Sequence, residues 1–499
     1  MKDEINSLEK NNTWILTKPP PNSAVIGNMW VFKVKQTITG KVQRFKARLV
    51  ARGDKQIKGV NYDQTQAPVI KSTTIMILLI IATKLKLTIK TIDINTAYLY
   101  AKLNEQIYMN LPDGFYQDKK NNGYKAKLLK SIYGLKQSAL LWYQTLSKAI
   151  KNLGFQQLYF DHCVFTKFTN ELVIIGIYVD DILIISSNQN EIIKFKENIR
   201  KHFDFKDSID FESIIGIKVS KDKKGNSYLI QDQYIKDMLK RYQMNNCNGC
   251  KTPMEHKINI FKDFKDDEQK LLPILPFQEC IGSLLYVLTR TRPDISFSVS
   301  ILAQVQLKPL KSHFLCIKRI FRYLKQTVNL GIKIDSSQQI CLSGFVDASF
   351  AINPGERKSI TGYIFFIDDT PICWKTRKQQ LVAKSTMESE LIALESAICE
   401  CLWIMRLLNE LNFKQHSIVL YCDNQATINF VQNKFIHSRN KYIDIQRCFS
   451  RQFIEDKSII LKYISTNDMK ADGLTKSLGQ NKFNIFLSQI NMNFIEEEC

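Results

Sequence analysis

Hydrophobic and polar positions alternate over residues 30–60, on both sides of Thr39-Gly40. This two-residue period predicts a β-hairpin with Thr39-Gly40 as its turn. Between Lys33 and Lys58 the segment holds nine basic residues and one acid. The basic side chains fall on one face of each strand, which suits contact with phosphate groups, although a solvated edge strand has the same pattern.

Further along, a continuous apolar stretch predicts a helix over Thr73–Lys84, and the run "LTIKTIDI" predicts a strand that ends near Asp93. Two β-rich runs within residues 173–186 flank Asp180 and Asp181 and predict a hairpin with this pair at its tip. Aspartate is a common turn residue, so the pair by itself also fits a solvated turn.

The pattern changes in the second half of the chain. Two blocks of helical periodicity, 279–305 and 313–327, follow a polar linker at 255–270. From Leu342 the pattern becomes strands, a long helix, and then strand and helix in alternation. This change predicts a domain boundary near 335–340, in keeping with a length of 499 residues.

Composition adds a strong positive charge. Lysine and arginine total 70 against 48 acids, a formal net charge of +22. Such an excess favours a polyanionic partner such as nucleic acid, although a lysine-rich soluble surface gives the same count. Twelve scattered cysteines indicate free thiols in a reducing compartment. Cys247-x-x-Cys250, with His256 nearby, has a zinc-like spacing but lacks a second pair.

The N-terminus is polar and the apolar runs are short, which predicts a protein with no signal peptide and no membrane partner.

Three acids lie at the ends of predicted strands: Asp93, Asp180 and Asp181. If the two strands belong to one sheet, their carboxylates meet. Clustered carboxylates take up protons unless cations hold them. Two divalent ions held by aspartates are the arrangement that in-line phosphoryl transfer uses, and Mg²⁺ suits carboxylate oxygens.

Four blocks carry a resemblance to a known family. The segments "KARLVARGDKQIKGVNYDQTQAPV", "TIDINTAYLYAKLNEQIYMNLPDGF", "LLKSIYGLKQSALLWY" and "YVDD" resemble the reverse transcriptase of copia-type LTR retrotransposon Pol polyproteins, in the family's order and spacing. The blocks "KTPM", "IGSLLYVLTRTRPDISFSVS" and "KRIFRYLKQT" extend the resemblance over nearly the whole chain.

The resemblance implies an α+β fold, a right-hand polymerase of fingers, palm and thumb followed by an α/β RNase H-like domain. The expected ranges are 1–245 for the reverse transcriptase (fingers, palm and the start of the thumb), 246–338 for a helical thumb and connection region, and 339–499 for the RNase H-like domain.

The family's metal-binding, catalytic acids correspond to Asp93, Asp180 and Asp181 in this sequence. The resemblance implies that Asp93 and Asp180 bridge both ions and that Asp181 is the lesser ligand. Tyr98 matches the aromatic residue that blocks a ribose 2′-hydroxyl by steric clash. A packed core tyrosine is the alternative for that position.

The same resemblance implies substrate contacts. Lys46 or Arg48 reaches the triphosphate of the incoming nucleotide, and the sequence leaves the choice between them open. Lys136 and Gln137 line the same pocket near the template, with Gly134 giving backbone clearance.

From Leu342 the pattern resembles an RNase H domain, which implies a second set of metal-binding, catalytic acids. They are a strand acid, a helix acid, a strand-end acid and a late acid: Asp347, Glu390, Asp423 and Asp472. Glu388 competes with Glu390, and the "ELIA" that starts at Glu390 favours the latter. Any one of these acids alone also fits a solvated helix or turn position.

The function implied is an RNA-directed DNA polymerase with RNase H activity, using two Mg²⁺ per site, with Mn²⁺ as the alternative ion. The implied partners are an RNA template, a DNA primer, an RNA–DNA hybrid and dNTPs, with capsid and integrase as further retroelement partners. The implied location is a cytoplasmic virus-like particle, with the nucleus as the alternative.

A different class of function stays open: a decayed or domesticated fragment that binds nucleic acid without catalysis. The sequence departs from the family pattern at five positions: Met76, Ala139, Ser349, Tyr442 and Cys448. All seven acids are present, which favours the enzyme. No protease, integrase or zinc knuckle is recognisable, so we expect a fragment of a longer polyprotein or a truncated reading frame.

Overall fold

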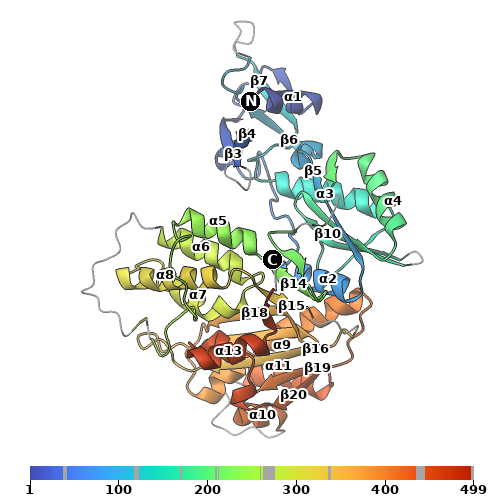
Figure 1. Cartoon of the computed structure of the whole chain (residues 1–499). Coiled ribbons are helices and arrows are strands. Elements are labelled where there is room, and N and C mark those ends of the chain that lie inside the picture. The colour runs from blue at the N-terminus through green and yellow to red at the C-terminus, as the bar shows by residue number, and fades with distance from the viewer. Residues whose placement is uncertain are drawn as a thin grey trace. The chain divides into compact units, whose positions relative to one another are not determined.

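The computed structural model describes residues 1–36, 42–116, 123–168, 171–207, 211, 213–258, 260–261, 276–334, 339–433 and 444–495 (Figure 1). The predicted turn at Thr39-Gly40, the departure at Tyr442 and most of the predicted linker lie outside the described residues. The chain divides into two compact units, the first made of 1–70 and 88–211 and the second of 71–87 and 212–499. The three domain ranges 1–245, 246–338 and 339–499 remain predictions.

The first unit is built mainly from antiparallel sheets. Its largest sheet has the strand order β12-β5-β11-β10-β9-β8, a second has the order β1-β7-β6-β2, and β3 pairs with β4 alone. The elements of this unit are α1 (Lys2–Lys10), β1 (Trp14–Thr17), β2 (Val25–Ile26), β3 (Asn28–Gln36), β4 (Val42–Ala51), η1 (Gly53–Lys55), β5 (Thr88–Ile94), η2 (Ala97–Tyr100), β6 (Lys102–Met109), β7 (Lys125–Lys130), α3 (Ser138–Asn152), β8 (Gln156–Gln157), β9 (Val164–Phe168), β10 (Leu172–Tyr178), β11 (Asp181–Ser186), α4 (Gln189–Arg200) and β12 (Phe205–Asp207).

Both predicted hairpins are confirmed. Strand β3 pairs antiparallel with β4, and Lys33 lies directly opposite Lys46, so the basic side chains of the two strands share one face. Strand β10 pairs with β11 through a tight turn at Val179 and Asp180, where Val179 has a φ of +59°. Both strands are rich in isoleucine and mostly buried, and this burial fixes the register of the hairpin.

The second unit contains a five-stranded mixed sheet and a four-stranded sheet. Their strand orders are β18-β17-β16-β19-β20 and β13-β14-β15-β21. The elements of this unit are α2 (Ser72–Lys84), β13 (Lys218–Lys221), β14 (Ser227–Ile230), α5 (Asp232–Arg241), α6 (Phe277–Leu288), η4 (Pro293–Ile295), α7 (Ser296–Ala303), α8 (Lys311–Gln326), β15 (Leu330–Lys333), β16 (Leu342–Ser349), β17 (Ile360–Ile367), β18 (Thr370–Lys378), α9 (Thr386–Glu410), β19 (Ile418–Cys422), α10 (Gln425–Gln432), α11 (Asp444–Glu455), β20 (Ile459–Tyr463), η6 (Thr466–Asp468), α12 (Asp472–Thr475), α13 (Gln480–Gln489) and β21 (Met492–Phe494).

The predicted fold class is confirmed, with two local differences. Strand β16 runs antiparallel to β17 and parallel to β19, and the long helix α9 packs on β16 and β17, as in an α/β layer (Figure 1). The block predicted as helical over 279–305 is two helices, α6 and α7, and Pro293 lies between them as the first residue of η4, a position that suits proline. The short strand β21 was not predicted; it pairs with β15 and so joins the C-terminal segment to the four-stranded sheet.

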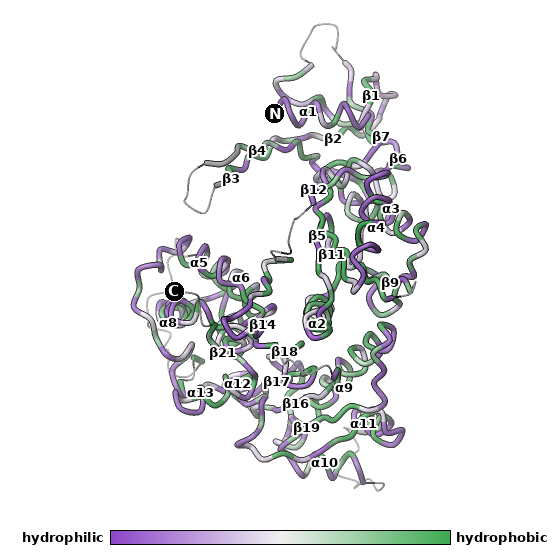
Figure 2. Tube along the Cα trace, turned by 45° about the vertical axis from the view of Figure 1, so that its right-hand side comes forward, coloured by the Kyte–Doolittle hydropathy of each residue, from purple (hydrophilic) through white to green (hydrophobic). Residues whose placement is uncertain are grey.

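Helix α2 lies between two segments of the first unit in the sequence and belongs to the second unit in space. It is apolar on all sides, as Figure 2 shows, and this pattern is typical of a buried helix. Its C-terminal Lys84 is fully buried and forms an ion pair of 2.8 Å with Asp368, in the turn between β17 and β18. At the other end, the ammonium group of Lys71 lies 3.6 Å from the ring centre of Trp403 on α9. No described helix combines the length and apolar character needed to cross a membrane.

The Lys84–Asp368 ion pair should hold α2 on the second unit. Changing Lys84→Ala leaves the Asp368 carboxylate without its cation in a mostly buried position, which should cost about 3–5 kcal/mol of local stability. We expect faster amide hydrogen exchange over residues 71–87 in the full chain, measured by mass spectrometry. Lys86→Asn, which removes an exposed lysine two residues away, is the control and should leave exchange unchanged. Equal protection in both variants would contradict this role for the pair.

Candidate active sites

Strand pairing brings the three acids of the first unit to one end of the large sheet. Strands β5 and β11 are antiparallel neighbours, and Asp93 lies directly opposite Asp181. The amide of Ile94 donates a hydrogen bond of 2.9 Å to the carbonyl oxygen of Asp180, which ties the turn to β5. Directly opposite residues project from the same face of a sheet, so Asp93 and Asp181 face one region.

The shared location perturbs these carboxyls. Burial, followed by the charges of Asp180 and Asp93, raises the pKa of Asp181 to about 6. Burial and the charge of Asp93 also raise the pKa of Asp180, while Arg48 and Lys46 oppose the rise. Among the described residues, the oxygens of these three acids are not gathered within 4.8 Å of one another, so joint coordination of an ion requires side-chain rotation.

Two tyrosines lie beside this acidic group. Tyr98 belongs to η2, which follows a left-handed residue at Thr96. Its ring packs edge-on against Tyr133 with 4.9 Å between ring centres, and the Arg48 guanidinium lies 4.5 Å from the centre of the Tyr133 ring. Burial raises the pKa of Tyr98, with a further contribution from the charge of Asp180. Tyr98 thus lies where the strand acids and the basic hairpin approach each other.

Lys46 and Arg48 point from one face of β4, two residues apart, and both act on the pKa of Asp180. Arg48 has the larger effect of the two. The alternative between them as the triphosphate contact stays open, since both belong to the same basic face.

The "YGLKQS" segment packs behind the hairpin. Gly134 has a φ of +96°, and a Cβ atom there would lie 2.2 Å from the carbonyl oxygen of Ala51, so only glycine fits against β4. Lys136 is exposed; its amine donates to the Tyr62 hydroxyl at 3.1 Å. Gln137 is buried and donates to the carbonyl oxygen of Asn61 at 2.8 Å. The lack of a side chain at Gly134 therefore lets the segment pack closely against β4. The Gln137 side chain makes internal hydrogen bonds, and its contact with substrate remains a prediction.

The acids of the second unit form a tighter group. Parallel pairing of β16 and β19 puts Asp347 near Asp423, and α12 begins beside them with Asp472. One oxygen from each of these three carboxylates lies within 4.8 Å of the others. Burial raises the pKa of Asp347 to about 6; Asp472 and Asp423 add to the rise, while Lys476 and a hydrogen bond from Thr475 oppose it.

Glu390 reaches the group from α9. Its Oε1 accepts a hydrogen bond of 3.2 Å from the amide of Ala348, and its Oε2 is buried without a hydrogen-bond partner among the described residues. Burial, followed by the charges of Asp347 and Asp423, raises the pKa of Glu390 well above its ordinary value. Glu388 instead accepts a hydrogen bond of 2.7 Å from the amide of Lys384, at the N-terminus of the helix. The geometry thus agrees with the preference for Glu390.

Sequence reasoning missed several residues that support these acids. The Thr475 hydroxyl donates to Asp347, the Thr466 hydroxyl donates to Asp423 at 2.9 Å, and Lys476 pairs with Asp472 at 2.6 Å. The i,i+4 spacing of Asp472 and Lys476 was a readable signal for that ion pair. Neither threonine carries a comparable signal, because its partner is distant in the sequence.

Both donor sets fit hard divalent cations. Magnesium binds through carboxylate oxygens, and each group offers at least three. The second group fits more directly, because its oxygens already lie within 4.8 Å of one another and Glu390 presents a buried oxygen without a donor. Residues Asp93, Asp180 and Asp181 would hold ions in the first unit, and Asp347, Glu390, Asp423 and Asp472 in the second.

Comparison with known proteins shows the family of the chain. Residues 11–256 match the family described as reverse transcriptase (RNA-dependent DNA polymerase). The retrovirus-related Pol polyprotein from transposon TNT 1-94 of Nicotiana tabacum is 36% identical over 499 residues, covering 99% of this chain and 37% of that protein. The corresponding polyprotein from transposon RE1 of Arabidopsis thaliana is 35% identical over 497 residues, covering 99% and 33%.

Among solved structures, a foamy viral protease-reverse transcriptase in complex with dsDNA matches with a TM-score of 0.48 and 13% identity, covering 93% of this chain and 82% of that one. The chain spans about a third of the length of the curated Pol relatives it matches. The chain belongs to the copia-type retrotransposon Pol polyproteins, and its residues 11–256 form a reverse transcriptase domain.

Proposed function

We propose that the first unit catalyses template-directed DNA synthesis, by attack of a primer 3′-hydroxyl on a deoxynucleoside triphosphate. The observation that carries the proposal is the direct pairing of Asp93 with Asp181, beside Asp180, in a chain with a reverse transcriptase domain. When bound, two divalent ions lower the pKa of the attacking hydroxyl and stabilise charge on the transferring phosphate. Asp93, Asp180 and Asp181 would hold these ions at the end of the sheet.

The neighbouring side chains would bind and select the nucleotide. Arg48 or Lys46 would contact the triphosphate by charge pairing, from the face of β4 that acts on Asp180. Tyr98, packed against Tyr133, has little freedom to move aside, so its ring would clash with a ribose 2′-hydroxyl and favour deoxynucleotides. Lys136 would bind phosphate near the template.

We propose that the second unit hydrolyses the RNA strand of an RNA–DNA hybrid. The group of Asp347, Asp423 and Asp472, with Glu390 beside it, supports this reaction class, which uses two divalent ions to activate water and stabilise the leaving oxygen. Thr475 and Lys476 would keep Asp347 and Asp472 oriented when no ion is bound. Both reactions need a polyanionic partner, which the net charge of +22 favours.

The alternative is a protein that binds nucleic acid without catalysis, and activity measurements distinguish it from an enzyme. Magnesium-dependent primer extension on poly(rA) is expected for the unmodified chain. Asp180→Asn should lower the rate by more than about 100-fold, because loss of an outer-shell partner already costs roughly 10–100-fold in metal sites. The control Asp63→Asn changes an exposed acid of the same unit and should keep its rate. A folded chain that binds hybrid but extends no primer would contradict the proposed DNA synthesis.

Hybrid cleavage tests the second unit in the same preparation. Asp423→Asn should lower cleavage of the RNA strand by more than about 100-fold, since Asp423 belongs to both groups of possible metal ligands. Primer extension by this variant should stay at the unmodified rate, because its polymerase acids are intact. Asp468→Asn, an exposed acid nearby, serves as the matched control. Cleavage that survives Asp423→Asn would exclude this group as the hydrolytic site.

Without a bound metal ion, the buried carboxylate of Asp347 should destabilise the fold at neutral pH. The pKa of this acid is about 6 in the folded chain and 3.8 ordinarily, so the folded state is favoured by protonation and loses stability as the pH rises from about 4 through 6. The difference corresponds to about 3 kcal/mol. In a chelator at pH 7.5, Asp347→Asn should therefore melt at a higher temperature than the unmodified chain, and the two should converge near pH 4. Added Mg²⁺ should stabilise only the unmodified chain at this site; a lower melting temperature for the variant at pH 7.5 would argue against this destabilisation.

A further inference from the structure

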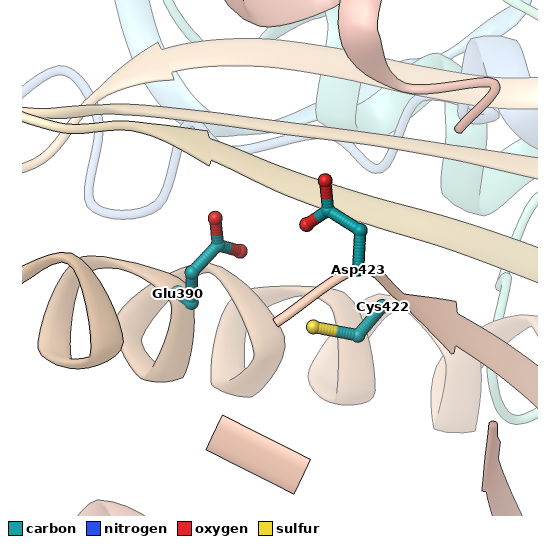
Figure 3. Close-up of side chains that lie close together, drawn as sticks. All are labelled: Glu390, Cys422 and Asp423. Atoms are coloured by element: carbon teal, nitrogen blue, oxygen red, sulfur yellow. The ribbon is translucent and has the colours of Figure 1, made fainter. Parts of the chain in front are cut away.

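The end of β19 places a sulfur atom beside two of the acids, and neither proposed reaction requires it. Cys422 is the last residue of β19 and is fully buried. Its Sγ and one carboxylate oxygen each from Glu390 and Asp423 all lie within 4.8 Å of one another. Figure 3 shows the three side chains converging from α9 and from the end of the strand. The group therefore offers one sulfur and two oxygen donors around a common point.

Glu390 gives a second, independent indication that something binds there. The residue is only 6% exposed, and its Oε2 is buried without a hydrogen-bond donor among the described residues. A buried carboxylate oxygen that lacks a donor is unfavourable unless a proton or a cation occupies the adjacent space. Its carboxylate extends on the same side as that of Asp423 (Figure 3). The carboxylate that carries the unpartnered oxygen thus lies beside the space that the sulfur also borders.

The mixed donor set suits a different ion from the all-oxygen set beside it. Magnesium takes oxygen ligands and keeps part of its water shell, so sulfur adds nothing to its binding. Zinc binds cysteine sulfur at about 2.3 Å and carboxylate oxygen at about 2.0–2.2 Å, in a tetrahedral arrangement. Those bond lengths need donor atoms somewhat closer than 4.8 Å, so binding requires the side chains to move toward a common centre.

We propose that Cys422, Glu390 and Asp423 form a binding site for a thiophilic divalent cation, zinc or cadmium, which competes with magnesium in the second unit. On binding, the S–H bond breaks, its proton leaves to the solvent, and a sulfur–metal bond forms. Because Glu390 and Asp423 serve both ion sets, occupation by the thiophilic ion excludes the hydrolytic arrangement. In the described part of the chain, no cysteine is grouped with Asp93, Asp180 and Asp181, so DNA synthesis should be less sensitive.

Cadmium tests the binding directly, because a cadmium–thiolate bond gives a charge-transfer band in the ultraviolet. Cys247 and Cys250 are three residues apart and would bind the same ion, so the parent for the titration is the full chain with serine at both positions. In this parent, Cys422→Ser and Cys422→Ala should each remove one thiolate contribution from the band. Glu390→Gln should keep the band and weaken cadmium affinity about tenfold or more.

The matched control is Cys401→Ser, which changes a buried cysteine on α9 and should leave the titration unchanged. Circular dichroism of each variant reports whether it is folded. A band of unchanged size and midpoint in both folded Cys422 variants would overturn the proposal.

Zinc inhibition tests the competition, and here the inference rests on the proposed hybrid cleavage. Each variant is compared with its own rate without zinc, so a change in basal activity does not matter. Zinc should inhibit cleavage by the parent, and the concentration for half inhibition should rise at least about tenfold in Cys422→Ser. If the parent cleaves no hybrid, the proposed function fails, and the cadmium band alone decides the site. If the band persists without Cys422 while cleavage still requires Asp423, the inference fails and the proposed function stands.

Discussion

The burial of carboxylates close to one another is the constraint on which both candidate sites depend. Burial, with a further contribution from the charges of neighbouring acids, raises the pKa values of Asp181, Asp347 and Glu390, a rise that reflects the unfavourable free energy of holding such groups together. Local sequence preferences alone would separate such groups. Backbone pairing keeps them together instead: β5 against β11 in the first unit, and β16 against β19 in the second. The apolar residues of these strands, by fixing the register, determine where the charges lie.

The two units moderate this unfavourable free energy in different ways. In the first, Asp93 is exposed to solvent, and Arg48 and Lys46 on the basic face of β4 oppose the rise in the pKa of Asp180. An open site with basic side chains beside the acids suits a negatively charged triphosphate. In the second, Asp347 and Glu390 are buried, and compensation comes from fixed neighbours such as Thr475 and Lys476. Its carboxylate oxygens are therefore grouped before any ion binds.

The sequence predicted the elements that carry strong local signals. Alternation predicted the hairpin of β3 and β4, two β-rich runs predicted the hairpin of β10 and β11, and an apolar run predicted the strand that ends near Asp93. Contacts between distant segments had no such signal: the packing of α2 with the second unit, the pairing of β21 with β15, and the Thr466–Asp423 hydrogen bond. The approach of Cys422 to Glu390 likewise had no local signal, because it depends on how α9 packs on the sheet.

The stability of the metal-free fold bears on whether the chain is an enzyme or a decayed remnant. A buried carboxylate that is repelled by its neighbours destabilises the fold, and a neutral residue of similar shape at that position would stabilise it. A protein that only binds nucleic acid through basic surfaces would become more stable if such acids were replaced, and stabilising substitutions of this kind are readily found. All seven acids are present, and Glu390 leaves an oxygen unpartnered in the interior. The departures from the family pattern, by contrast, spare these positions: Met76, for example, is an apolar residue buried in α2. The grouped acids destabilise the fold when no cation is bound, and all seven are nevertheless present. This combination favours a protein whose sequence is adapted to binding metal ions.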